Sequence, residues 1–263
     1  MKFLDKNLVP IEIEGQYVDA ILNEANKYFV HAEVSSYSTD FNDTYSDTFY
    51  NNFRIKQEDI IVENNKFYGV KVIAKGDYNE TKETIVSPNN PTNIYMGSVY
   101  SNTSTTFHLY NFDRISIVSL KDRPDLIKES AKRFSLMFDI DIKEYLKSMD
   151  EMLTSSTYPL WLVALIDSNN IIGGLGVIEN DFHSRKDLSP NICAVFTLSA
   201  YRGIRISQLL INKAIEMMHQ VNIDTLYVIT DHIGLYEKYG FEYLCDTECG
   251  DETSRLLIHK YKE

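Results

Sequence analysis

Residues 192–221, ICAVFTLSAYRGIRISQLLINKAIEMMHQV, decide the fold. The stretch opens with ICAVFTLS, an apolar run whose β-branched and aromatic residues favour a buried strand. It closes with SQLLINKAIEMMHQV, a helical pattern whose core face carries Leu210, Ala214, Met217 and Met218. The polar turn YRGIRIS joins the two. A buried strand that leads through a tight turn into a long amphipathic helix is typical of α/β proteins.

The segments around this stretch extend it into a mixed α/β sheet. Residues 114–263 contain elements in the order β-α-α-β-β-β-α-β-α-β-β, judged from their hydrophobic patterns. The second and third strands form an antiparallel hairpin, because the turn formers Ser168, Asn169 and Asn170 separate two apolar runs. We therefore predict an α/β domain over residues 113–263.

Residues 1–112 are rich in Tyr, Asn, Asp, Ser and Thr, and predict a smaller β-rich module. We expect a helix over residues 16–29 and a hairpin around Asn64 and Asn65. Two more strands, IYMGSVY and TFHLYNF, follow the loop SPNNPTN. The stretch SSYSTDFNDTYSDTFYNN, residues 35–52, is full of turn formers and predicts irregular structure. The module could bind a partner, cover a sheet edge or form a homodimer interface, and its composition does not choose among these roles.

Charge and composition exclude several classes of function. The net charge of −12 and the pI near 5.0 argue against a nucleic-acid partner and favour a cationic substrate. Cys193, Cys245 and Cys249 match no disulfide framework and no zinc pattern, so we expect reduced thiols and no metal. The N-terminus lacks the apolar run of a signal peptide, and no apolar stretch is long enough to span a membrane. These features predict a cytoplasmic protein without membrane contact.

Several motifs resemble the GNAT superfamily of acetyl-CoA-dependent N-acetyltransferases. YRGIRIS lies between a strand and a long helix, and LYEKYGFEYL lies near the end of the chain. GGLGVIENDFH, DLSPNICAVF and TDHIGLYEKYGFEYLC are similar to a bacterial GNAT subgroup whose members have no assigned substrate. The resemblance covers residues 114–263. It implies a mostly antiparallel sheet flanked by helices and acetyl-CoA as acyl donor.

The turn YRGIRIS corresponds to the family's pyrophosphate loop, Arg/Gln-x-x-Gly-x-Gly/Ala. Independently of the family, a helix N-terminus offers unpaired N–H groups and a positive dipole end to an anion. Arg202 and Ser207 match the signature, whereas Arg205 stands where glycine is usual. Its side chain either crowds the phosphate or adds a direct contact to it. The resemblance implies a phosphate site formed by Arg202, Gly203, Ile204, Arg205, Ile206 and Ser207.

Other cofactor contacts are implied in the strand before this loop and near Asp231. In the family, the corresponding strand splays from the next one, and its main chain binds the pantetheine arm. Asp231 stands where many members have an asparagine that contacts the cofactor, and it could instead cap the following helix or orient His232. The strand residues to which the resemblance assigns main-chain contacts are Val195, Phe196, Thr197 and Leu198.

The resemblance also assigns the acid of the reaction. Tyr236 occupies the position of the family tyrosine that protonates the departing thiolate. A base for the amine is available from Glu179, Asp181 or His183, which follow a strand beside the expected cleft. Cys193 as a nucleophile would give an acylated enzyme, but its place in an apolar strand favours a buried structural thiol.

We therefore predict an N-acetyltransferase that moves an acetyl group from acetyl-CoA directly to a primary amine. The acceptor, a small molecule or a peptide amine, has no recognisable code in the sequence. The alternative is a regulatory protein that binds CoA or another ligand on a GNAT fold without turnover, because Arg205 replaces a glycine of the phosphate loop.

Overall fold

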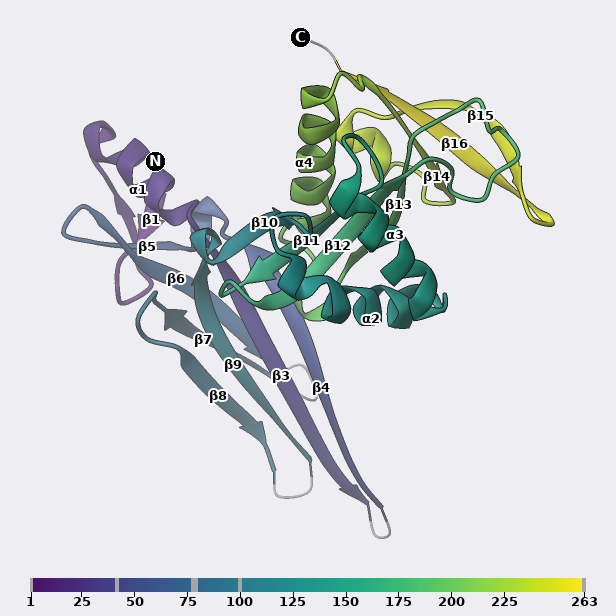
Figure 1. Ribbon diagram of the computed structural model, residues 1–263. Helices are drawn as coiled ribbons and strands as arrows, with labels where there is room; N and C mark the ends of the chain where they lie inside the picture. Colours follow the sequence, from purple (N-terminus) through teal and green to yellow (C-terminus); the bar gives the residue numbers. More distant parts are fainter. Residues whose placement is uncertain (1, 41–42, 77–79, 99–100, 262–263) are drawn as a thin grey trace. The chain divides into compact units, whose positions relative to one another are not determined.

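The structure is a computed structural model that describes residues 2–40, 43–76, 80–98 and 101–261 (Figure 1). It divides into two compact units. One comprises Met1–Arg114 together with Ser199–Ile204, and the other comprises Ile115–Leu198 and Arg205–Glu263. No helix in the described ranges is both long enough and apolar enough to cross a lipid bilayer.

The C-terminal unit is built on a seven-stranded sheet with the order β10-β11-β12-β13-β14-β16-β15. All neighbours pair antiparallel except β13 and β14, which are parallel. The predicted mixed, mostly antiparallel sheet is confirmed. Its strands are β10 (Ile115–Ser119), β11 (Leu160–Ile166), β12 (Asn170–Ile178), β13 (Asn191–Thr197), β14 (Thr225–Thr230), β15 (Glu242–Cys249) and β16 (Glu252–Lys260).

Helices cover both faces of this sheet. On one face lie α2 (Ile127–Phe138), which begins after a 3-10 turn at Pro124–Leu126, and α3 (Ile142–Thr154). On the other lies α4 (Ile206–Gln220), and its Leu210 packs where a Cβ on Gly173 would point. The short helix expected before β15 is a 3-10 turn, η6 (Tyr236–Tyr239), ended by Gly240 in a left-handed conformation.

Strands β13 and β14 diverge soon after they meet. Their register contains only the pairs Asn191–Tyr227 and Ile192–Val228. On its other side, β13 has a register shift against β12, and Ala194 adopts a positive φ of 50° there. A bulge of this kind bends a strand and redirects its main-chain groups. The sheet therefore opens beside the C-terminal half of β13, as the family resemblance implied.

The N-terminal unit contains two sheets, with the orders β2-β1-β5-β6-β7 and β4-β3-β9-β8. Buried side chains from β3, β6, β7, β8 and β9 form one hydrophobic cluster, and α1 (Gly15–Ala25) packs on a second cluster with β1 and β5. The expected β-rich module is present. Its strands are β1 (Lys2–Leu4), β2 (Pro10–Glu12), β3 (Tyr28–Asp40), β4 (Asp43–Arg54), β5 (Ile60–Glu63), β6 (Lys66–Lys75), β7 (Thr81–Val86), β8 (Thr92–Gly97) and β9 (Ser101–Asn111).

Some of the local predictions for this unit are confirmed, and others differ from the structure. The hairpin around Asn64 and Asn65 is confirmed, and both residues have positive φ values of 50° and 58°. The helix ends at Ala25, before the residue 29 expected, because β3 begins at Tyr28. The strands predicted over residues 94–100 and 106–112 correspond to β8 and β9, although residues 99–100 lie outside the described part of the chain.

The prediction of irregular structure over residues 35–52 was wrong. These residues lie in β3 and β4, which pair in continuous antiparallel register, while residues 41–42 fall outside the described ranges. Thr, Tyr and Phe are strand formers, and polar residues tolerate a strand with a solvated face. Hydroxyl pairs across the strands, such as Ser35 Oγ and Thr48 Oγ1 at 3.3 Å, contribute further.

The segment Ser199–Ile204 groups with the N-terminal unit because of contacts to β3 and β4. The Asn52 side-chain amide donates to the carbonyl oxygens of Ala200 and, at 3.0 Å, Arg202. His31 Nδ1 lies 2.8 Å from Asn52 Oδ1, so it orients this amide. The ring of His31 also stacks on Tyr201, with centroids 5.9 Å apart. These contacts hold the start of the YRGIRIS loop.

Candidate functional site

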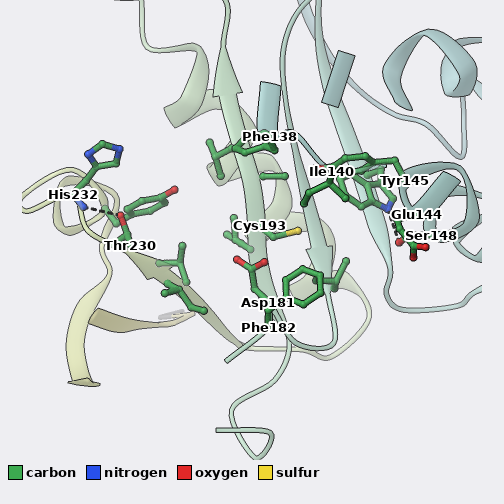
Figure 2. Close-up of a pocket in the computed structure, with 18 of the residues that line it drawn as sticks. Phe138, Ile140, Glu144, Tyr145, Ser148, Asp181, Phe182, Cys193, Thr230 and His232 are labelled. Atoms are coloured by element: carbon green, nitrogen blue, oxygen red, sulfur yellow. Dashed lines mark hydrogen bonds between the residues drawn. The ribbon is translucent and has the colours of Figure 1, made fainter. Parts of the chain in front are cut away.

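A cavity of about 540 Å³ lies where β13 and β14 diverge (Figure 2). One part of its wall comes from β13, β14 and η6, and includes Cys193, Ala194, Val195, Thr230 and Tyr236. The other part comes from α2, α3, β11 and the end of β12, and includes Phe138, Ile140, Glu144, Tyr145, Ser148 and Trp161. Volumes of this size hold small-molecule ligands in many proteins.

Asp181 lies between these two parts of the wall (Figure 2). Burial raises the pKa of its carboxyl to about 6, because the charged form is poorly solvated there. Its negative charge in turn contributes to raised pKa values of Tyr145, Cys193 and Tyr236. A carboxyl that titrates near neutrality is suited to accept a proton.

The loop that carries Asp181 is anchored by His183. The His183 side chain is buried, with Nε2 2.9 Å from Asn191 Oδ1 and 3.1 Å from Asn180 Nδ2. Asn191 Nδ2 donates to the backbone oxygens of Glu179, at 3.2 Å, and Leu188, at 2.9 Å. Glu179 is exposed, and neither it nor His183 lines the cavity. Of the three candidate bases, the cavity wall includes Asp181 alone.

Tyr236 belongs to η6 and lines the cavity. Its side chain is 7% exposed and packs edge-on against Phe241, with ring centroids 5.8 Å apart. Burial raises the pKa of the phenol strongly, and the charge of Asp181 raises it further. The hydroxyl therefore stays protonated across the physiological range and is available as a hydrogen-bond donor.

Cys193 lines the same cavity, but its thiol is buried. Burial, with the charge of Asp181, raises the pKa of the thiol well above its usual value. A thiol held in the neutral form is a poor nucleophile. Its environment therefore fits the structural thiol that the sequence favoured.

Asp231 and His232 lie on the rim of the cavity, and both are exposed. The His232 amide donates to Thr230 Oγ1 at 3.0 Å, which shapes the end of β14. The interpretation of Asp231 as a helix cap was wrong, because η6 begins after Leu235 and has no side-chain cap. Asp231 is thus free of that structural role.

Of the strand residues Val195 to Leu198, only Val195 lines the cavity. Phe196 is buried against Phe134, with ring centroids 5.0 Å apart. Thr197 pairs with Gly173 of β12, and the Leu198 amide donates to the Ile172 carbonyl at 2.9 Å. Ala194, which the sequence reasoning missed, joins Val195 in the wall.

The residues of the expected pyrophosphate loop are divided between the two units, after Ile204. In the N-terminal unit, Arg202 and Gly203 are exposed, whereas Ile204 is buried. In the C-terminal unit, Arg205 is exposed with a φ of 69°, and its carbonyl accepts the Leu209 amide at 3.1 Å to begin α4. A left-handed backbone of this kind favours glycine over residues that have a Cβ.

The first amides of α4 belong to Ile206 and Ser207. They have no intrahelical acceptor, as at any helix N-terminus. Ile206 is buried and fixes the start of the helix, and Ser207 Oγ lies 3.2 Å from the Tyr239 hydroxyl. The arrangement provides backbone donors for an anion.

The sequence reasoning missed the α3 and β11 part of the wall. Glu144, Tyr145 and Ser148 project from α3, and Trp161 Nε1 donates to Ser148 Oγ at 3.0 Å. The helical spacing of the three α3 residues puts them on one face, but it does not identify what that face meets. In the described part of the chain, no three His, Cys, Asp or Glu side chains cluster closely enough to hold a metal ion.

A family model described as "Acetyltransferase (GNAT) domain" matches residues 158–243. The match includes the diverging β13 and β14, the start of α4 and Tyr236. Over residues 158–243 the chain is similar to GNAT acetyltransferase domains. The GNAT resemblance of the sequence is therefore confirmed over these residues.

Solved structures of GNAT proteins are similar to this chain over about half of its length. An acetyltransferase of the GNAT family from Staphylococcus aureus Mu50 shares 22% identity, covers 56% of this chain and 99% of its own, with a TM-score of 0.38. A putative streptothricin acetyltransferase from Bacillus anthracis, in complex with acetyl coenzyme A, shares 18% identity over 43% and 68%, with a TM-score of 0.36. The GNAT family N-acetyltransferase YhbS from Escherichia coli, in complex with CoA, shares 16% over 56% and 81%, with a TM-score of 0.39. No curated protein sequence matches the chain.

Proposed function

We propose that the chain is an N-acetyltransferase that transfers an acetyl group from acetyl-CoA to a primary amine by direct attack. One observation carries the proposal: Asp181 and Tyr236 line one cavity, where β13 and β14 diverge. One of these groups titrates near neutrality and the other stays protonated. A base and a proton donor on one cavity suit aminolysis of a thioester.

The protein groups beside the cavity fit the acyl donor. Beyond Ile192, β13 is no longer paired in register with β14, so its main chain is available to the amides of a pantetheine arm. The amides of Ile206 and Ser207 begin α4 and suit a pyrophosphate. In this proposal Arg205 adds a charged contact to the phosphates, as a guanidinium commonly does. Gly203, with a φ of 83°, lets the main chain approach closely before that helix.

The proposed reaction balances as follows. The bound ammonium gives one proton to Asp181, which passes it to solvent. The neutral nitrogen attacks the thioester carbonyl carbon, forming the C–N bond and moving an electron pair to oxygen. The electron pair on oxygen then re-forms the C=O bond as the C–S bond breaks, sulfur leaves with the C–S bonding pair, and the Tyr236 hydroxyl gives sulfur its proton. The remaining extra proton on nitrogen restores the hydroxyl through water. An ammonium and acetyl-CoA thus yield an amide, CoA and one proton.

The proposal predicts distinct effects of three substitutions. Tyr236→Phe should keep acetyl-CoA binding, measured by isothermal titration, and lower kcat about 10²-fold or more. Asp181→Asn should lower kcat/KM by a similar factor, because it removes the group that accepts the proton of the amine. Cys193→Ala should retain most of the activity, because the thiol takes no part in direct transfer.

Calorimetry of acetyl-CoA binding and assays of activity together distinguish the proposed function from its alternatives. Wild-type protein that binds acetyl-CoA but acetylates no amine would support the regulatory alternative. Wild-type protein that binds no acetyl-CoA, while Arg205→Gly binds it, would mean that Arg205 closes the phosphate loop. Loss of activity in Cys193→Ala, with an acetylated cysteine in the wild type, would replace direct transfer by an acyl-enzyme.

The pH profile follows from the raised pKa of Asp181. The ionised carboxylate is the active form, so kcat/KM should rise about tenfold per pH unit below pH 6 and flatten above it, after correction for the ionisation of the amine itself. Asp181→Asn should lose this limb and keep only the amine's own limb. A profile that is identical in both proteins would exclude Asp181 as the base.

A further inference from the structure

The cavity wall formed by α2, α3, β11 and the end of β12 has a chemical character that narrows the class of acceptor substrate. It is largely aromatic and aliphatic, through Phe138, Ile140, Tyr145, Trp161, Ile178 and Phe182. Tyr145 and Trp161 are buried, and their rings pack edge-on at 5.5 Å. Figure 2 shows Ile140 and Tyr145 of this wall on the side of the cavity away from Thr230, the last residue of β14. With the thioester beside Tyr236, as in the proposed function, the apolar wall faces the acceptor.

The polar groups of the cavity differ in what they offer to a substrate. The indole N–H of Trp161 is already satisfied by Ser148 Oγ at 3.0 Å, so it offers little to a substrate. Among the described residues that line the cavity, the acidic groups are the carboxyls of Glu144, Asp181 and Asp231, and there is no lysine or arginine. A cavity with this charge attracts a cation and repels an anion.

Phe182 completes the apolar wall next to Asp181. Its side chain is 71% exposed, although it lines the cavity, and its backbone has a positive φ of 61°. The neighbouring His183 is buried and bridges to Cys249 in β15, so the loop that presents Phe182 is fixed on one side. An exposed aromatic ring held beside a buried carboxyl is suited to cover a bound ring while the carboxyl receives its amine.

We infer, on the basis of the proposed function, that the acceptor is a small primary amine on an aromatic or similarly apolar body, such as an arylalkylamine. Its nitrogen lies at Asp181, and its body packs between Phe182 and the wall of Phe138, Ile140 and Tyr145. An aminosugar would place several hydroxyls against the apolar side chains of Phe138 and Ile140 without partners, which binding sites reject.

The test compares amines on the full-length protein. Binding of 2-phenylethylamine in the presence of saturating CoA is measured by calorimetry, and initial rates with acetyl-CoA are measured for 2-phenylethylamine, 1,4-diaminobutane and kanamycin. We expect kcat/KM for 2-phenylethylamine to exceed that of the two polar amines by at least tenfold. A preference for either polar amine would overturn the inference and leave the acetyltransferase proposal standing.

The matched variants are Phe182→Ala and Leu136→Ala. Leu136 is a control because its side chain is 75% exposed on α2 and does not line the cavity. Phe182→Ala should raise KM for 2-phenylethylamine about tenfold with an unchanged KM for acetyl-CoA, and Phe182→Leu should recover part of the loss. Leu136→Ala should change neither constant. Equal constants in wild type and Phe182→Ala would overturn the inference.

A protein that binds CoA but turns over no amine would contradict the proposed function alone. Calorimetry would still test the class of ligand. Binding of 2-phenylethylamine to the CoA complex, with lower affinity in Phe182→Ala, would support the inference, and an absence of binding would overturn it. The variant Glu144→Gln provides a second test of the same inference. It should weaken 2-phenylethylamine binding a few-fold at low salt, and the difference should shrink as salt increases. A Glu144→Gln effect that is independent of salt would contradict the attraction of a cation by that carboxylate.

Discussion

At Asp181, the same burial that suits the carboxyl for proton transfer has a cost in folding free energy. The pKa rises from 3.8 to about 6, so the folded state holds more protons than the unfolded state between these values. Stability must therefore fall as pH rises through this window and stay lower above it. A difference of about two pKa units corresponds to about 3 kcal/mol, and partial exposure of the group reduces this to about 2 kcal/mol.

Asp181→Asn should accordingly stabilise the protein at pH 8 by about 2 kcal/mol, because it removes a poorly solvated charge. At pH 4 the wild-type carboxyl is protonated, and the gain should largely vanish. Urea unfolding at both pH values measures the difference. Asp187→Asn is the control, since Arg185 lowers the pKa of this exposed carboxyl to about 2 and its loss brings no gain at pH 8. An equal effect of Asp181→Asn at both pH values would contradict the assigned burial.

At the residue scale, the backbone conformation of Arg205 also has a cost in folding free energy. Its φ of 69° is left-handed, which disfavours residues that have a Cβ by about 1 kcal/mol. Arg205→Gly should therefore leave the stability unchanged or raise it by up to about 1 kcal/mol. Arg202→Gly, outside the positive-φ positions, should lower it by about 0.5–1 kcal/mol through the entropy of the unfolded chain. Thermal unfolding of the two variants decides the point, and an equal loss in both would exclude relief of strain.

At the scale of elements, the glycines of β12 leave space beside the cavity for large side chains of neighbouring elements. A Cβ on Gly176 would lie 2.7 Å from the Trp161 ring and 2.9 Å from Cys193 Sγ, and one on Gly174 would lie 2.6 Å from Phe134. The glycines of β12 thus admit large side chains from β11 and α2. Ala194 and its bulge on β13 lie beside the same position. The cavity depends on this close approach of strand to aromatic ring.

Gly176→Ala should destabilise the protein by about 1–3 kcal/mol, because the added methyl overpacks a dense region. It should also displace Trp161 or Cys193 and lower acceptor affinity. Gly15→Ala, at the start of α1, is the matched control, since no atom lies within 4 Å of its added Cβ. Urea unfolding of both variants provides the comparison. A Gly176→Ala protein as stable as the control would mean that the strand pair relaxes freely.

At the scale of the whole molecule, the N-terminal unit contains part of the expected pyrophosphate loop. Ser199–Ile204 groups with that unit, and Asn52 holds two of its carbonyls. A fragment of residues 115–263 lacks Asn52 and the strands around it. The loop would then be free before it enters α4, and ordering it on binding would cost conformational entropy.

The fragment of residues 115–263 should therefore bind acetyl-CoA at least tenfold more weakly than the full chain, and far-UV circular dichroism checks that the fragment is folded. Asn52→Ala in the full chain should reproduce part of that loss, because it removes the two hydrogen bonds to the loop. Calorimetric titration measures all three proteins. Equal affinity in the fragment and the full chain would show that the N-terminal unit does not prepare the loop.

Local patterns in the sequence determined the class of fold and much of its order. The strand–turn–helix of residues 192–221 corresponds to β13 and α4, and the paired apolar runs correspond to β11 and β12. The Asn64–Asn65 turn also formed as expected. These features depend on periodicity and turn chemistry within a few residues, which a sequence displays directly. The roles of Tyr236 and Asp181 stay predictions until the variants are measured.

Tertiary structure decided the rest, because it depends on residues far apart in the chain. Residues 35–40 and 43–52 became strands through pairing with each other, and residues 35–38 also pair with β9, against their turn-forming composition. Asp181, rather than Glu179 or His183, lines the cavity because buried His183 anchors their loop from within. The raised pKa of Asp181 comes from desolvation by its surroundings, and the acceptor wall is assembled from α2, α3, β11 and the end of β12. Desolvation and cavity shape are sums over neighbours in space, so no local pattern contains them.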